Sequence, residues 1–140
     1  MTTEYKLIKL KTIADERGGL VALESNKNVP FEIKRVYYLY GTGEAVIRGY
    51  HAHNKLKQLA ICVSGKCKFL LDNGQEKEII QLDSVDVGLY MSGLIWREMF
   101  EFSHDCVLMV LADDFYNEAD YIRDYNVFKN TIQNIKWELK

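Results

Sequence analysis

The sequence predicts a mostly β domain, an antiparallel sandwich or barrel that ends in a helical segment. Two observations support this fold class: about ten short apolar runs follow one another, and turn residues separate them. A third is the change of period near the C-terminus, where apolar residues recur every three or four positions. With 140 residues and no low-complexity run, the chain is expected to form a single domain over residues 1–140.

The first half of the chain contains five predicted strands. The first alternates apolar and basic residues, as a half-buried strand does. The third contains Val36-Tyr37-Tyr38-Leu39-Tyr40, a run of β-branched and aromatic residues that Gly41 ends. The five predicted ranges are 6–11, 20–23, 33–40, 45–50 and 59–63.

The second half of the predicted β-structure begins with two turns. Residues 59–63 and 66–71 are expected to form a hairpin around Ser64-Gly65, which would place Cys62 opposite Cys67. These two cysteines and Cys106 are expected to be reduced, packed thiols. Asp72-Asn73-Gly74 is a strong turn signal. The later predicted strands are 78–82, 85–91, 94–100 and 106–112.

The tail has a helical period and predicts one amphipathic helix, or two short ones, over residues 117–135. Such a segment would cover one opening or one edge of the β-structure. Three tyrosines here are interpreted as packing surface rather than as part of a site: Tyr116, Tyr121 and Tyr125. The apolar positions that carry the helical period are Tyr121, Ile122, Tyr125, Phe128, Ile132 and Ile135.

Composition argues against several classes of function. The formal net charge of -2 gives no broad reason to expect nucleic acid as a partner. No run approaches the roughly 18 apolar residues that a membrane span needs, so no membrane partner is expected. The N-terminus lacks the basic-then-apolar pattern of a secretion signal. A cytoplasmic location is therefore predicted.

The most informative stretch is Gly49-Tyr50-His51-Ala52-His53. Histidines two apart on a strand project from the same face, so two of the three histidines of the chain would point to one place. Taken alone, the pair is a weak signal, because a metal site, an acid–base site and a pair without function all fit it. The third histidine, His104, lies in a polar turn and is interpreted as an exposed loop residue.

The spacing around this pair resembles the first signature of the cupin superfamily, matched by Gly49, His51, His53 and Gly65. The resemblance implies a double-stranded β-helix jelly roll. Gln58 stands where cupins have an acidic residue, and in the second signature, residues 88–98, Arg97 stands where they have a histidine. An arginine cannot bind a metal and would repel one. We therefore predict a cupin with no metal and no cofactor, whose histidines transfer protons.

Several further residues suit an anionic, oxygen-rich ligand. Arginine forks match diphosphate oxygens, and aromatic faces match a base or a sugar ring. Taken singly, each arginine is better explained as a solvated surface charge, and Trp96 is equally well explained as core packing. Taken together, the residues expected to bind substrate are Arg17, Arg35, Arg48, Trp96, Arg97 and Glu98.

Over nearly its whole length the chain resembles the dTDP-sugar 3,4-ketoisomerases. That family converts dTDP-4-keto-6-deoxyglucose to a 3-keto isomer for the 3-amino sugars of bacterial surface polysaccharides. The resemblance implies a homodimer, without metal, in which an N-terminal strand can be exchanged and Arg17 can reach the partner's site. The segments that carry it are residues 30–38, 48–53, 87–90, 95–99, 107–112 and 120–123.

The implied reaction moves a ketone from C4 to C3, which is a net proton shift without redox change. It needs a base, a second group for hydroxyl protons, and cations for the oxyanion. His51 is the predicted base. Tyr37 and His53 are the candidates for the hydroxyl proton or for orienting the base. Arg48 and Arg97 are expected to stabilise negative charge or to bind phosphate.

Two points stay open from the sequence. In the family, Arg at position 17 with His at position 97 goes with the galacto product, and Tyr with Arg goes with the gluco product. This chain has Arg17 and Arg97 and so combines the two patterns; the place of Arg97 beside the histidines favours the gluco product. The alternative functions are a dTDP-sugar 3,5-epimerase, whose family shares the elements at 15–18 and 48–51, a non-catalytic sugar-nucleotide-binding cupin, and a metal-dependent oxygenase.

Overall fold

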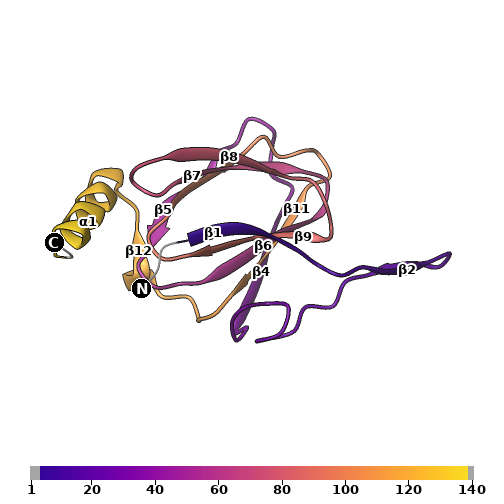
Figure 1. Cartoon of the computed structure of the whole chain (residues 1–140). Coiled ribbons are helices and arrows are strands. Elements are labelled where there is room, and N and C mark those ends of the chain that lie inside the picture. The colour runs from indigo at the N-terminus through magenta and orange to yellow at the C-terminus, as the bar shows by residue number, and fades with distance from the viewer. Residues whose placement is uncertain (1–3, 139–140) are drawn as a thin grey trace.

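The computed structural model describes residues 4–138, which form one β-sandwich and one terminal helix (Figure 1). The predicted mostly β fold with a C-terminal helix is confirmed. The elements are β1 (Glu4–Lys9), β2 (Ile13–Asp15), β3 (Gly18–Leu20), β4 (Arg35–Tyr40), β5 (Arg48–His53), β6 (Gln58–Ser64), β7 (Cys67–Asp72), β8 (Lys77–Leu82), β9 (Val87–Ser92), β10 (Trp96–Phe100), β11 (Val107–Ala112), the 3-10 helix η1 (Glu118–Asp120), β12 (Tyr121–Ile122) and α1 (Tyr125–Glu138).

Two five-stranded antiparallel sheets face each other and enclose the main core. Their strand orders are β1-β9-β6-β11-β4 and β12-β5-β10-β7-β8. Both sheets contribute to one buried cluster that includes Phe69, Leu89 and Leu108. At one side of the sandwich, edge strand β4 and the β5–β12 pair are the parts that will frame the site.

The outer face of each sheet is also covered in part. Strand β6 points Ala60 and Cys62 into the main core, while Leu59 and Ile61 pack outward against residues that include Phe31. Because both faces of β6 are buried, its sequence is continuously apolar rather than alternating. On the other sheet, helix α1 covers the outer face of β5 and β10.

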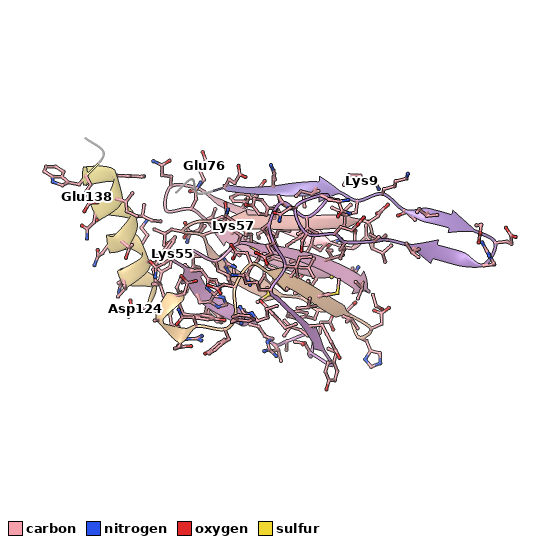
Figure 2. The ribbon with its side chains drawn as sticks, turned by 90° about the horizontal axis from the view of Figure 1, so that it is seen from below. Lys9, Lys55, Lys57, Glu76, Asp124 and Glu138 are labelled. Atoms are coloured by element: carbon pink, nitrogen blue, oxygen red, sulfur yellow. The ribbon has the colours of Figure 1, made fainter. Side chains whose placement is uncertain are left out.

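Strands β2 and β3 form an arm that projects from the sandwich at the end opposite α1 (Figures 1 and 2). Its outward residues include Ile13 and Leu20, which are 62% and 56% exposed. Arg17 occupies the turn between the two strands, where its guanidinium donates to the Asp15 carboxylate. The turn predicted around Arg17 is therefore present, but the strand predicted at 20–23 ends at Leu20.

The hairpin predicted around Ser64-Gly65 is wrong. Strand β6 pairs with β9 and β11, whereas β7 pairs with β8 and β10, so this turn carries the chain from one sheet to the other. Both cysteines still point into the shared core. The Sγ atoms of Cys62 and Cys67 lie 3.5 Å apart, and Cys62 Sγ lies 3.7 Å from Cys106 Sγ. All three thiols are free and buried, as predicted.

The helix predicted over residues 117–135 is partly wrong. Tyr121 and Ile122 form a short strand that pairs with His53 and Ala52 of β5, and α1 begins only at Tyr125. Asp124 explains this start, because its carboxylate accepts from the backbone N–H groups of residues 126 and 127. No helix within residues 4–138 has the length and apolar character needed to cross a membrane.

Candidate active site

Two adjoining cavities lie between β4, β5 and the segment after β11. The larger has a volume of about 340 Å³ and the smaller about 240 Å³. Strand β4 alternates, so that Arg35, Tyr37 and Leu39 face inward while the residues between them are exposed. The larger cavity is lined by Arg35, Tyr37, Leu39, Arg48, Gly49, His51, Met99, Tyr116, Tyr121 and Arg123.

A β-bulge in β5 brings Arg48 and His51 into the same cavity. Residues three apart on a regular strand point to opposite faces. Here His51 pairs with Arg97 and Gly49 pairs with the next residue of β10, so Tyr50 is an extra residue without a partner. Gly49 permits this path, because its φ is +95° and an added Cβ would lie 2.8 Å from the Arg97 carbonyl oxygen.

The two histidines project together, as the sequence predicts. Their ring centroids are 4.9 Å apart, and the ring of Tyr121 lies 5.0 Å from His51 and 4.3 Å from His53. Burial and the positive charge of Arg97 lower the pKa of His51 to about 4, and the same two causes lower the pKa of His53 further. Both imidazoles are therefore neutral at pH 7 and able to accept a proton.

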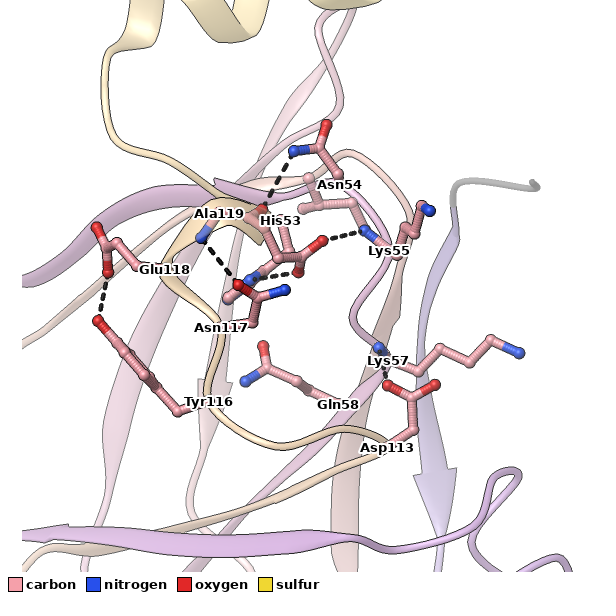
Figure 3. A network of polar contacts seen from close by, with 12 residues as sticks. His53, Asn54, Lys55, Lys57, Gln58, Asp113, Tyr116, Asn117, Glu118 and Ala119 are labelled. Atoms are coloured by element: carbon pink, nitrogen blue, oxygen red, sulfur yellow. Dashed lines mark hydrogen bonds and ion pairs between the residues drawn. The ribbon is translucent and has the colours of Figure 1, made fainter.

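Asp120 contacts the Nδ1 edge of the His53 ring. Its Oδ2 lies 3.1 Å from His53 Nδ1, and its Oδ1 accepts from the backbone N–H of Lys55 at 2.9 Å (Figure 3). Because the carboxylate accepts, the neutral ring carries its proton on Nδ1 and leaves Nε2 as the free lone pair. That Nε2 is buried and has no hydrogen-bond partner among the described residues.

A buried polar chain runs behind the histidines. Arg97 donates to Gln58 Oε1, and Gln58 Nε2 donates to the Tyr37 hydroxyl oxygen at 3.0 Å. Arg97 also donates to the carbonyl of Ile95 at 3.1 Å. Arg97 and Gln58 are only 3% and 2% exposed, so Arg97 lies behind the cavity rather than in its lining.

Positive charge dominates the larger cavity. Within residues 4–138, Arg35, Arg48 and Arg97 form no ion pair, whereas Arg123 is paired with Glu118 at 2.7 Å. The Arg35 guanidinium lies over the ring of Tyr37, 5.4 Å from its centroid, and its Nε is buried without a partner. These unneutralised cations are suited to an anionic ligand.

Three predicted site residues lie elsewhere. Trp96 and Glu98 are on the opposite face of β10 from Arg97, where Trp96 packs against Phe128 of α1 and donates to Glu98. They do not line either cavity, because adjacent strand residues point to opposite faces. Arg17, at the tip of the arm, does not line the cavities of its own chain either.

The residues around the histidine pair do not fit a cupin metal. The oxygen of Gln58 is already occupied by the guanidinium of Arg97, and that buried cation would repel a metal ion. Among the described residues, the group of three potential metal ligands that lies together is Cys62, Cys67 and Cys106, in the apolar core rather than at the histidines. The donor set at the site therefore favours acid–base chemistry.

Comparison with known proteins places this site in a family. Residues 3–133 match the family model described as "FdtA: WxcM-like, C-terminal". The chain belongs to this family. It is 53% identical, over 135 residues, to the TDP-4-oxo-6-deoxy-alpha-D-glucose-3,4-oxoisomerase of Aneurinibacillus thermoaerophilus, a match that covers 96% of this chain and 97% of the relative.

Solved structures agree with the assignment of this FdtA-family chain. The 3,4-ketoisomerase QdtA from Thermoanaerobacterium thermosaccharolyticum, in complex with TDP, is 45% identical with a TM-score of 0.91, covering 93% of this chain and 95% of QdtA. The TDP-quinovose 3,4-ketoisomerase WlaRB from Campylobacter jejuni is 49% identical with a TM-score of 0.87, covering 90% and 97%. The cupin-type jelly-roll fold predicted from the sequence is thereby confirmed.

Sequence reasoning missed four residues of this FdtA-family site. Tyr116, Tyr121 and Arg123 line the larger cavity, and Asp120 contacts His53. The interpretation as packing surface holds for Tyr125, which packs against Trp96 and Phe128. It is wrong for Tyr116 and Tyr121, because the chain forms the short strand β12 beside β5 instead of continuing one amphipathic helix past the site. The signal was present in the sequence, since residues 120–123 are among the segments that carry the family resemblance.

Proposed function

We propose that this chain converts dTDP-4-keto-6-deoxyglucose to its 3-keto isomer. The observation that carries the proposal is a neutral His51 in a cavity with unpaired arginines, in a chain 53% identical to a 3,4-oxoisomerase. The C3 proton of the substrate is acidified by the adjacent C4 carbonyl. Its removal gives an enediolate, and delivery of a proton to C4 completes a shift that balances without any redox partner.

His51 is the proposed base. It lines the larger cavity, and its low pKa keeps the ring unprotonated before substrate binds. A diphosphate and an enediolate both bring negative charge close to this ring, which stabilises the imidazolium that forms when the proton is taken. The base therefore becomes stronger when the substrate is present.

His53 and Tyr37 are proposed to handle the hydroxyl protons. Asp120 fixes His53 with Nε2 unprotonated, which suits it to accept a proton from a sugar hydroxyl. Tyr37 lines the larger cavity and can donate to the oxyanion that develops at the former ketone. The arginines 35, 48 and 123 are proposed to bind the diphosphate, with the side chains of Tyr116 and Tyr121 against the ring system of the ligand.

The projecting arm supports the proposal of a homodimer. An isolated two-stranded hairpin is marginal in water, and this one exposes apolar side chains at Ile13 and Leu20. A second subunit would cover the arm and could receive Arg17 at its own cavity. Sedimentation at several protein concentrations, with Arg17→Ala assayed in parallel, tests this; a monomer with full activity would contradict it.

A cytoplasmic location is proposed because three contacting thiols stay free in a reducing compartment.

We further infer the gluco product. Arg97 lies behind Gln58 and cannot act as an acid at C4, as the histidine of the galacto pattern could. A relative 49% identical is a TDP-quinovose 3,4-ketoisomerase, and quinovose has the gluco configuration. NMR of the product formed in H₂O tests this inference directly, since the coupling of the C4 proton to the C5 proton differs between the two configurations.

The decisive experiment is NMR of the product formed in D₂O, repeated with His51→Asn. We expect a 3-keto product with deuterium at C4, and a loss of turnover in the variant of roughly 10³-fold with TDP binding retained, because the change removes a base and not the arginines. Inversion at C5 with the ketone still at C4 would identify a 3,5-epimerase instead. Recovery of unchanged substrate without deuterium would identify a non-catalytic binding protein.

A further inference from the structure

We propose that Gln58 is a positioning residue that passes the positive charge of buried Arg97 to the hydroxyl group of Tyr37. This inference rests on the proposed function and deepens it, since it says how an FdtA-type site manages without the metal of other cupins. The two positions at which the sequence departs from the cupin metal ligands are Gln58 and Arg97. In the structure these two residues are hydrogen-bonded to each other.

The polarity of the chain follows from the chemistry of its first member. A guanidinium has donors and no acceptor, so the Gln58 oxygen must face Arg97. The amide N–H₂ is then the group that faces Tyr37, and it donates to the phenol oxygen at 3.0 Å. With its oxygen accepting from Gln58, Tyr37 keeps its own proton for another acceptor. Tyr37 lines the larger cavity, so that acceptor can be a substrate oxygen.

Burial makes this arrangement effective. Arg97 and Gln58 are 3% and 2% exposed, and the described acceptors of Arg97 are the neutral oxygens of Ile95 and Gln58. A cation without a carboxylate is costly to bury, and its field is only weakly screened there. Burial lowers the pKa of Arg97 to about 10, so it stays charged at neutral pH. The donated bond polarises the amide, which in turn makes the Tyr37 hydroxyl a stronger donor.

Replacement of the amide by a carboxylate separates this role from simple packing. Gln58→Glu keeps the shape and the contact with Arg97, but a carboxylate cannot donate to Tyr37 and it neutralises the guanidinium. Tyr37 would then donate to residue 58 and no longer to the substrate. We expect kcat to fall roughly 10²-fold, the size of effect seen when one oxyanion donor is removed, with KM and TDP binding little changed. Gln75→Glu, in the exposed turn after β7, is the matched control and should keep full activity.

A double-mutant cycle with Tyr37→Phe tests the connection between the two residues. If Gln58 acts through Tyr37, Gln58→Glu should cost nothing further once the hydroxyl is gone. Additive losses, or a Gln58→Glu enzyme within about twofold of the parent kcat, would overturn the proposal. If Gln58→Glu does not fold, Gln58→Leu takes its place in the same cycle with the same expectation.

A titration of Tyr37 gives a readout that does not need turnover. Burial raises the pKa of Tyr37, whereas the charge of Arg97 and the bond from Gln58 lower it. With 3-fluorotyrosine incorporated and the Tyr37 resonance assigned through Tyr37→Phe, the ¹⁹F midpoint should therefore move further upward in both Gln58 variants. An unmoved midpoint would overturn the proposed role of Gln58 between Arg97 and Tyr37. If the unsubstituted protein forms no 3-keto product but the midpoint of Tyr37 still moves in the Gln58 variants, the proposed function is contradicted and the role of Gln58 is supported.

Discussion

The buried part of strand β6 begins with Gln58 and ends with Cys62, and these two ends are chemically opposite. Gln58 at one end is 2% exposed and joins a chain of buried polar groups, while Cys62 near the other end is 1% exposed and contacts two further thiols in an apolar core. Packing alone favours the cysteine end, since buried polar groups cost free energy unless they are fully hydrogen-bonded. Near the polar end, three buried nitrogens have no hydrogen-bond partner among residues 4–138; they belong to Arg35, His51 and His53. Leaving them unpaired costs free energy on folding, and the proposed substrate has hydroxyl and phosphate groups that can pair with them.

The difference between the two ends can be sharpened first at Asp120. Asp120→Asn keeps the size of the side chain but lets an N–H₂ face His53 Nδ1, which favours the other ring tautomer. We expect kcat to fall roughly 10²-fold with TDP binding retained. Steady-state kinetics check the first part, and ¹⁵N chemical shifts of His53 check the tautomer. Full activity with a changed tautomer would show that His53 takes no part in proton transfer.

A smaller effect is expected from pH on the polar end. The pKa of His51 lies near 4 in the folded chain and near 6.5 when exposed, so between these values the unfolded chain binds a proton that the folded chain does not. The free energy of unfolding should therefore fall as pH is lowered from 7 toward 4, and urea titrations at pH 7 and pH 5 measure it. In His51→Asn the loss should be smaller. An equal fall in the free energy of unfolding of the variant would show that a group other than His51 binds the proton.

The smallest effect on activity is expected at the cysteine end. Cys106→Ala removes a buried sulfur from the apolar core and should lower the free energy of unfolding by about 1 kcal/mol, because a small cavity is left. Neither kcat nor KM should change by more than about twofold, since none of the three thiols lines either cavity. Urea unfolding and steady-state kinetics on one preparation make the comparison. A fall in kcat beyond about twofold would show that the cysteine cluster affects the active site.

The sequence predicted most of the β-structure and the residues that carry chemistry at short range. Alternation in β4 placed Arg35 and Tyr37 on one face, and the spacing of His51 and His53 placed them together. What failed depended on long-range pairing. The turn at Ser64-Gly65 has the local signals of a hairpin, but which sheet each flanking strand joins is decided by partners far away in the chain.

The tail failed for a related reason. Tyr121 and Ile122 fit a helical period, yet they pair with the free edge of β5, because hydrogen bonds to an existing strand outweigh a weak local preference. Asp120 therefore reaches His53 across 67 positions of sequence, which no local pattern reveals. Trp96 and Glu98 show the converse. They were grouped with Arg97 because they adjoin it in the sequence, but adjacent residues of a strand point to opposite faces.

The extra residue at Tyr50 has a consequence for how such chains diverge. A relative could lose the extra residue without losing the site, because Arg48 and His51 would then stand two apart on a regular strand and would still share one face. A relative that kept the extra residue but exchanged Gly49 would fare worse. Any side chain there would meet the Arg97 carbonyl oxygen at 2.8 Å in a left-handed backbone conformation, so the bulge could not form. On a regular strand of the same length Arg48 would face away from His51 and from the cavity. A residue without a side chain thus decides where the arginine points.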